Sequence, residues 1–140
     1  MMQHKFFSKI GAFSVNLSEP RAALKSLRYA VDSLKRNNSS LFIYPEGKIV
    51  PFSPKKPEFQ KGLGWIAGHT PDSDIVPIGI YIHTARHDKP ELNIKIGPAV
   101  TFNSEQSSED LNLLFEKNMQ QILIDLQAKA HSNPEQFISI

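Results

Sequence analysis

The chain has 140 residues, of which 40% are hydrophobic and 21% are charged, so it can bury a globular core as a single domain over residues 1–140. It contains no cysteine, which excludes thiol catalysis, disulfide bonds and thiolate metal sites. The formal net charge is only +2, so nucleic-acid binding would depend on one lysine-rich loop alone, and no nucleic-acid partner is expected. The longest apolar run, residues 75–82, is far shorter than the roughly 20 residues that cross a bilayer. Any membrane contact is therefore expected to be peripheral or to be made by a part of the protein outside this sequence.

The first elements alternate between strand and helix patterns, which is typical of an α/β domain. Residues 10–16 predict a short strand. A helix is predicted next, because Ser18 can cap its free amides and Pro20 is tolerated in the first turn. Apolar residues then recur at spacings of three and four, at Leu24, Leu27, Val31 and Leu34.

The middle of the chain contains a short apolar run and a long loop. Residues 40–44 predict a buried parallel strand that Pro45 ends. The loop over residues 46–57 is rich in proline, and long loops of this kind commonly carry function. A short helix is predicted over residues 59–68.

Two strands and one long helix are predicted in the last part of the chain. Residues 75–82 predict a buried strand in which Pro77 indicates a bulge or an edge, and residues 92–96 predict another strand. The last helix has one apolar stripe and begins near Ser107, which can form a capping box with Asp110. The sequence as a whole predicts an α/β fold with a mixed, mostly parallel sheet flanked by helices.

The residues that follow the predicted strand at 40–44 are the most informative. In open α/β sheets, ligands bind outside the carboxyl ends of the strands. At that end, Glu46 can hold a hydroxyl, Gly47 lets the backbone approach a ligand, and Lys48 can meet a phosphate group. The same residues are also compatible with a plain tight turn and a solvated acid. Four lysines lie close together in this part of the chain: Lys48, Lys55, Lys56 and Lys61. They can form a basic face that attracts phosphate groups or an anionic membrane, or they can belong to an ordinary solvated loop.

Tyr44-Pro45-Glu46-Gly47 resembles the phenylalanine-proline-glutamate-glycine block of the glycerol-phosphate and lysophosphatidate acyltransferase family, also described as lysophospholipid acyltransferases. Residues 11–16 (GAFSVN), 59–62 (FQKG) and 75–78 (IVPI) resemble three further blocks of that family, and they occur in the family's order. Gly97-Pro98 resembles the glycine that closes a later strand. The resemblance runs from about residue 6 to residue 97, and its continuation to the last helix is expected.

The resemblance implies transfer of a fatty acyl group from an acyl-coenzyme A or acyl-carrier-protein thioester to a hydroxyl of a glycerol phosphate or lysophospholipid. This chemistry belongs to phospholipid biosynthesis and lipid metabolism, and the resemblance implies a cytoplasmic location with peripheral attachment to a membrane surface. It places Glu46 and Gly47 near the acceptor, with Lys48, Asn16 and Arg21 as further acceptor-binding candidates. No cofactor and no metal site are expected.

The chain also departs from the family pattern. The family's general base is the histidine of a histidine-x4-aspartate motif, whose aspartate orients the imidazole, and this motif should precede Gly11. The only histidine there is His4, and Lys9 stands where the aspartate is needed. The arginine of the upstream block is replaced by Leu17. We therefore expect an N-terminally truncated family domain with no catalytic residue of its own and with exposed apolar surface that favours a homo-dimer.

Two histidine-x4-aspartate pairs occur later, at His69 with Asp74 and at His83 with Asp88. Both follow the glutamate block, which is the wrong order for the family, so neither is predicted to be catalytic. His83 and His87 flank a predicted turn and give no metal geometry. Two alternatives to an acyltransferase stay open: a non-catalytic lipid-surface or acyl-binding module, and, less favoured, a metal-dependent phosphate-ester enzyme.

Overall fold

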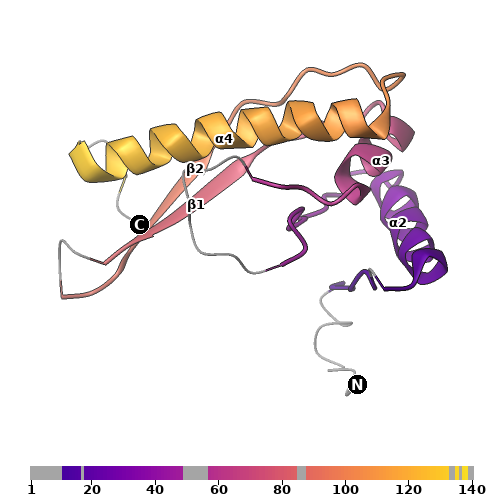
Figure 1. Cartoon of the computed structure of the whole chain (residues 1–140), viewed down its shortest axis with the longest axis horizontal. Helices are drawn as coiled ribbons and strands as arrows, with labels where there is room; N and C mark the ends of the chain where they lie inside the picture. The colour runs from indigo at the N-terminus through magenta and orange to yellow at the C-terminus, as the bar shows by residue number, and fades with distance from the viewer. Residues whose placement is uncertain are drawn as a thin grey trace. The chain divides into compact units, whose positions relative to one another are not determined.

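The computed structural model describes residues 11–16, 18–48, 57–84, 88–132, 135 and 137–138. The chain divides into two compact units, Met1–Phe42 and Ile43–Ile140, and each is described by itself (Figure 1). The first unit contains helix α2 (Pro20–Leu34). The second contains helix α3 (Gly62–His69), strands β1 (Ile78–His83) and β2 (Glu91–Ile96), and helix α4 (Ser108–Ser132). The single domain predicted over residues 1–140 stays a prediction.

Helix α2 confirms the predicted helix, but its start differs from the prediction. Glu19 is the N-cap residue and makes no side-chain capping bond, and Pro20 occupies the first turn. Ser18, the predicted cap, lies one residue before the N-cap position. Its backbone N–H donates to the side-chain oxygen of Asn16 at 3.1 Å. The helix ends after Leu34, where the Ser39 hydroxyl donates to the Leu34 carbonyl at 3.1 Å and so satisfies an end group that the helix cannot pair itself.

The strand predicted at residues 10–16 is wrong for residues 11–16, which form no strand. This segment is exposed and is tied to α2 by side chains. The Ser26 hydroxyl donates to the Ser14 carbonyl at 3.2 Å, and the rings of Phe13 and Tyr29 meet edge to face with centroids 5.2 Å apart. A strand exists only where its backbone pairs with a neighbouring strand, and here the contacts come from a helix.

Helices α3 and α4 pack together around the main apolar cluster of the second unit. Gly64 allows the α3 backbone to approach the start of α4 closely, because a Cβ atom at this position would lie 2.1 Å from the backbone oxygen of Ser108. Helix α4 starts as predicted: the Asp110 N–H donates to the Ser107 hydroxyl at 3.1 Å, and that hydroxyl donates to the Asp110 carboxylate at 2.7 Å. The buried centre of the cluster consists of Ala67, Leu111 and Phe115.

Strands β1 and β2 form a two-stranded antiparallel sheet, so the predicted mostly parallel sheet is wrong for the described residues. The connection between the strands spans only residues 84–90, and a parallel pair needs a crossover of about a dozen residues or more. The strand predicted at 75–82 begins at Ile78, so Pro77 precedes the strand, where its missing N–H costs no ladder bond. The N–H of Gly97 donates to the Pro77 carbonyl at 2.9 Å and extends the pairing.

One face of this hairpin packs on α4. A Cβ atom on Gly79 would lie 2.9 Å from a methyl carbon of Ile122, and Lys95 forms an ion pair with Asp125. The opposite face carries aliphatic side chains that are between 47% and 68% exposed: Ile80, Ile82, Leu92, Ile94 and Ile96. We call these five residues the aliphatic hairpin face. In the part of the chain that the structure describes, no helix is both long and apolar enough to cross a bilayer.

Candidate functional site

The predicted site residues Glu46, Gly47 and Lys48 lie in a turn rather than at the end of a strand. The backbone N–H of Gly47 donates to the Tyr44 carbonyl at 3.2 Å, which closes the turn. Gly47 has a φ of 65°, in the left-handed region that favours glycine. The Glu46 side chain is half-buried, and Lys48 is exposed. The turn therefore presents a carboxylate and an ammonium group on the two residues that flank Gly47.

The buried strand predicted at residues 40–44 is wrong. These residues form no strand, and Phe42 and Tyr44 are 79% and 87% exposed. The first unit ends at Phe42 and the second begins at Ile43, so the boundary between the units falls inside this segment. A short apolar run becomes a buried strand only when a sheet covers it, and within the described residues the sheet consists of β1 and β2.

Two of the four lysines of the predicted basic face are paired with carboxylates. Lys48 lies 3.7 Å from Glu58, and Lys61 lies 2.8 Å from Glu109. The hydrogen bond to Glu109 raises the pKa of Lys61 above its ordinary value of 10.5. Both pairs are exposed, so each contributes little stability. Lys55 and Lys56 lie outside the described residues.

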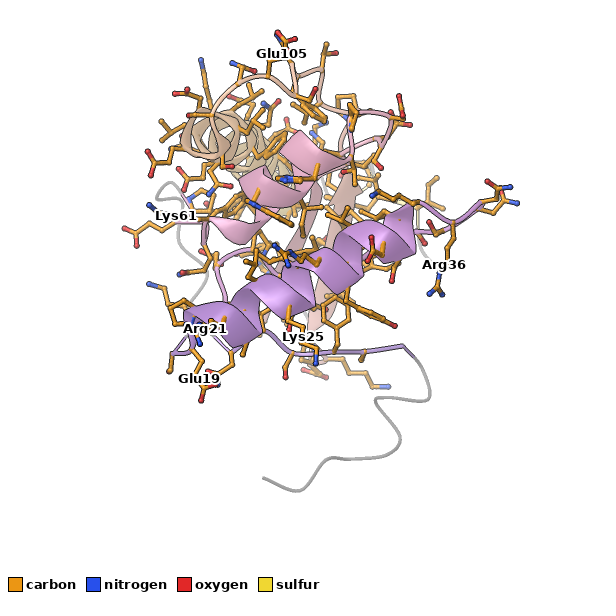
Figure 2. All side chains as sticks on the ribbon, turned by 90° about the vertical axis from the view of Figure 1, so that its right-hand side faces the viewer. Glu19, Arg21, Lys25, Arg36, Lys61 and Glu105 are labelled. Atoms are coloured by element: carbon orange, nitrogen blue, oxygen red, sulfur yellow. The ribbon has the colours of Figure 1, made fainter. Side chains whose placement is uncertain are left out.

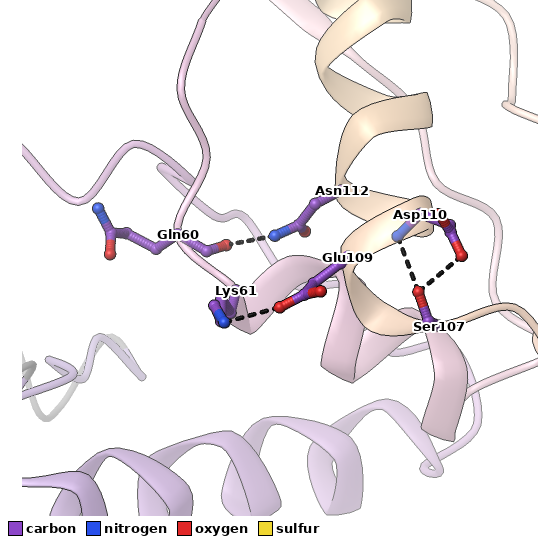
Figure 3. A network of polar contacts seen from close by, with 6 residues as sticks. All are labelled: Gln60, Lys61, Ser107, Glu109, Asp110 and Asn112. Atoms are coloured by element: carbon purple, nitrogen blue, oxygen red, sulfur yellow. Dashed lines mark hydrogen bonds and ion pairs between the residues drawn. The ribbon is translucent and has the colours of Figure 1, made fainter.

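The segment that follows the loop is held by helix α4. Glu116 accepts the N–H of Phe59 at 2.8 Å, and the Asn112 amide donates to the Gln60 carbonyl at 3.1 Å. The side-chain oxygen of Asn112 accepts the N–H of Gly64 at 2.7 Å. Figure 3 shows the Asn112 amide directed at Gln60. Asn112 and Glu116 are 6% and 9% exposed, so α4 contributes buried polar groups that satisfy the backbone at the start of α3.

The other two predicted site residues belong to the first unit. Asn16 accepts the Ser18 N–H with its side chain and the Glu19 N–H, at 3.3 Å, with its carbonyl, so it shapes the turn before α2. Arg21 is exposed in the first turn of α2, and Figure 2 shows it projecting from that helix, as Lys25 does one turn later. The five predicted residues are thus divided between the two units, with Glu46, Gly47 and Lys48 in the second.

A comparison with protein-family models decides the family. The model described as Acyltransferase matches residues 1–81, which are 81 of the 140 residues. The chain belongs to the acyltransferase family. No curated protein and no solved structure matches it significantly. The acyltransferase match ends within β1, so β2 and α4 lie beyond the matched segment.

The two later histidine-aspartate pairs of the chain have other surroundings. The Nδ1 atom of His69 lies 2.8 Å from the Trp65 carbonyl, and the two rings stack with centroids 3.9 Å apart. The His69 ring is therefore oriented by its own helix rather than by Asp74. His83 is buried, and its Nδ1 atom has no hydrogen-bond partner among the described residues, so Asp88 does not orient it through that atom. His87 and His4 lie outside the described residues.

A shallow groove with a volume of about 260 Å³ is lined by residues 71–74 and 99–102. It contains the carboxylates of Asp72 and Asp74 and none of the five predicted site residues. Two acids in one groove repel a phosphorylated acceptor. Across the described ranges, no group of three or more histidine and acidic side chains could hold a metal ion.

Sequence reasoning missed the residues that support the turn. Gln60 lies within the FQKG block, in which the family pattern specifies only the phenylalanine and the glycine. Asn112 and Glu116 directly follow Leu111 and Phe115 in the apolar stripe of α4, at the same spacing of four. Two polar residues that track a buried stripe indicate buried hydrogen bonds, and this signal was present in the sequence.

Proposed function

We propose that this acyltransferase-family chain binds the acyl acceptor, a glycerol phosphate or a lysophospholipid, at the turn formed by residues 44–48. The observation that carries the proposal is that Glu46 and Lys48 stand on either side of the left-handed Gly47 in one turn, in a chain whose family is established. In the reaction, the acceptor hydroxyl oxygen attacks the carbonyl carbon of an acyl thioester. The new C–O bond forms, the C–S bond breaks, and the hydroxyl proton passes to a base while the thiolate leaves.

Two residues of the turn, Glu46 and Lys48, have roles in this proposal. Glu46 accepts a hydrogen bond from an acceptor hydroxyl and so orients it. Lys48 exchanges Glu58 for the acceptor phosphate, which carries more charge than a carboxylate. Asn16 and Arg21, which belong to the first unit, stay predicted acceptor-binding residues, and no role at the turn is assigned to them.

No residue of this chain is assigned the role of general base. Removal of a positioned base commonly slows a reaction by about 10²–10⁴-fold. We therefore propose that the 140-residue chain by itself binds the acceptor without measurable acyl transfer. The donor, an acyl-coenzyme A or acyl-carrier-protein thioester, and a role in phospholipid biosynthesis are parts of the same proposal.

The test is a titration of the chain with sn-glycerol 3-phosphate, followed by NMR at low salt. Glu46→Ala is expected to weaken binding by about tenfold, because a hydrogen bond to a charged group is worth about 1.5–3 kcal/mol. Glu58→Gln is expected to tighten binding, since it frees Lys48. Glu105→Ala removes an exposed carboxylate elsewhere in the second unit and serves as the matched control. Binding that Glu46→Ala leaves unchanged contradicts the proposal.

A second candidate function is that of a non-catalytic lipid-surface module, and the aliphatic hairpin face favours it. Five aliphatic side chains on one face of a hairpin form a contiguous apolar surface, and such surfaces commonly mark interaction sites. The occupants considered are a membrane surface and a second copy of the chain. Ile80 and Ile94 are cross-strand partners at its centre.

Liposome flotation distinguishes the two occupants. The double variant Ile80→Lys/Ile94→Lys is expected to abolish binding to neutral phosphatidylcholine vesicles. Ile124→Lys places one lysine at an exposed position on α4 and is the control. Sedimentation that shows a dimer in the unmodified chain and a monomer in the double variant, without vesicle binding, assigns the face to a second copy instead.

A further inference from the structure

Gln60 connects the turn of residues 44–48 to the rest of the second unit. Its backbone N–H donates to the Pro45 carbonyl at 2.8 Å, and its side-chain amide donates to the Glu46 carbonyl at 3.3 Å. The two carbonyls belong to the central residues of the turn that Gly47 closes onto Tyr44. One residue therefore holds both central peptide groups of the turn that carries the Glu46 side chain.

Gln60 is itself held by helix α4. Asn112 donates its amide to the Gln60 carbonyl at 3.1 Å and accepts the Gly64 N–H with its other side-chain atom at 2.7 Å. On the neighbouring residues, Glu116 accepts the Phe59 N–H, and Lys61 pairs with Glu109. Residues 109, 112 and 116 of α4 are spaced by three and four positions, so they share one face of the helix. Figure 3 shows Glu109 directed at Lys61 and Asn112 directed at Gln60.

We propose that Gln60 and Asn112 are positioning residues of the acceptor site: Asn112 fixes Gln60, and Gln60 fixes the Pro45–Glu46 backbone. This inference rests on the proposed acceptor role of Glu46. It extends the site to α4, which lies beyond the segment that the family model matches. Neither residue touches the acceptor; each acts on the direction in which the Glu46 carboxylate points.

The physical reason is preorganisation. A side chain on an exposed turn reaches many orientations, and each additional backbone restraint reduces the entropy lost when a ligand selects one. The Gln60 side chain is exposed, so its loss removes a restraint without opening a cavity. Asn112 is buried, and both polar atoms of its amide are used, so its position relative to α3 is closely determined.

The first test is Gln60→Met, which keeps the length of the side chain and removes its N–H donors. The exchange of the Gly47 amide with water, measured by NMR in the absence of ligand, is expected to accelerate by about two- to fivefold. Binding of sn-glycerol 3-phosphate is expected to weaken by a similar factor. Gln121→Met, at an exposed position on α4, is the control and should change neither quantity.

The second test is Asn112→Asp, which keeps the acceptor for Gly64 and removes the donor to Gln60. It is expected to accelerate exchange of the Gly47 amide in the same way. Asn118→Asp makes the same change on the same helix, where the amide donates to the Leu114 carbonyl four residues earlier, and it should leave Gly47 unchanged.

The outcomes separate this inference from the proposed function. A Gly47 amide that does not respond to Gln60→Met overturns the positioning role, whatever the acceptor affinity is. A Gly47 amide that responds, in a chain whose glycerol 3-phosphate binding is insensitive to Glu46→Ala, overturns the acceptor site while Gln60 still holds the turn. Response of both the amide and the affinity supports the positioning role.

Discussion

The close contact of α3 with α4 predicts opposite effects for two glycine-to-alanine substitutions in the same helix. A Cβ atom at Gly64 would lie 2.1 Å from the Ser108 backbone oxygen and 2.9 Å from the side-chain oxygen of Asn112. A backbone atom cannot move aside as a side chain can, so Gly64→Ala forces the helices apart. Overpacking costs about 1–3 kcal/mol, and loss of the Gly64–Asn112 hydrogen bond adds about 1 kcal/mol. The higher helix propensity of alanine than of glycine offsets about 0.5–1 kcal/mol of this loss.

The matched control is Gly68→Ala, where the nearest atom, the Ser104 backbone oxygen, would lie at an ordinary 3.6 Å. This substitution is expected to leave stability unchanged or raise it by up to about 1 kcal/mol. The assay is urea unfolding followed by the fluorescence of Trp65, the only tryptophan of the chain, which lies within α3. Gly64→Ala should lower the free energy of unfolding by about 2 kcal/mol, which shifts the midpoint by roughly 1 M. The reasoning is refuted if the two variants have the same midpoint.

Two further predictions use the same assay. Leu126 is fully buried on α4, so Leu126→Ala should lower the free energy of unfolding by about 2–5 kcal/mol. Leu113 on the same helix is 53% exposed, so Leu113→Ala should change that free energy by no more than about 0.5 kcal/mol. Equal losses of stability would show that α4 does not present the Leu126 face to the core. The hydrogen bond from Lys95 lowers the pKa of Asp125 below its ordinary value of 3.8. The charged carboxylate therefore stabilises the fold at pH values above 3.8. This stabilisation is lost as the pH falls through the lowered pKa. Asp125→Asn should therefore cost about 0.2–1 kcal/mol at pH 7 and less at pH 3, and a difference that does not shrink with pH would contradict the assignment.

Local patterns in the sequence predicted the helices well. The spacing of Leu24, Leu27 and Val31 predicted α2, and Ser107 with Asp110 marked the start of α4, because apolar periodicity and capping act within a few residues of the chain. The family was also readable from short blocks in a fixed order, since those blocks are themselves sequence patterns.

Strand pairing was not decided by local patterns. Residues 11–16 and 40–44 have the composition of strands but form none, and β1 pairs with β2 in an antiparallel rather than a parallel arrangement. An apolar run does not specify its partner, because strand hydrogen bonds join segments that are distant in sequence. The short connection over residues 84–90 was the one sequence feature that favoured a hairpin.

For the candidate site, the sequence by itself determined the family and the residue types of the turn at 44–48, since each depends on residue identity. The left-handed φ of Gly47 and the hydrogen bond from its N–H to the Tyr44 carbonyl came from the structure. Only the tertiary structure decided that Gln60 holds this turn and that Asn112 holds Gln60. Those hydrogen bonds join residues separated by 14 to 52 positions in the chain, and their formation depends on how α4 packs against α3.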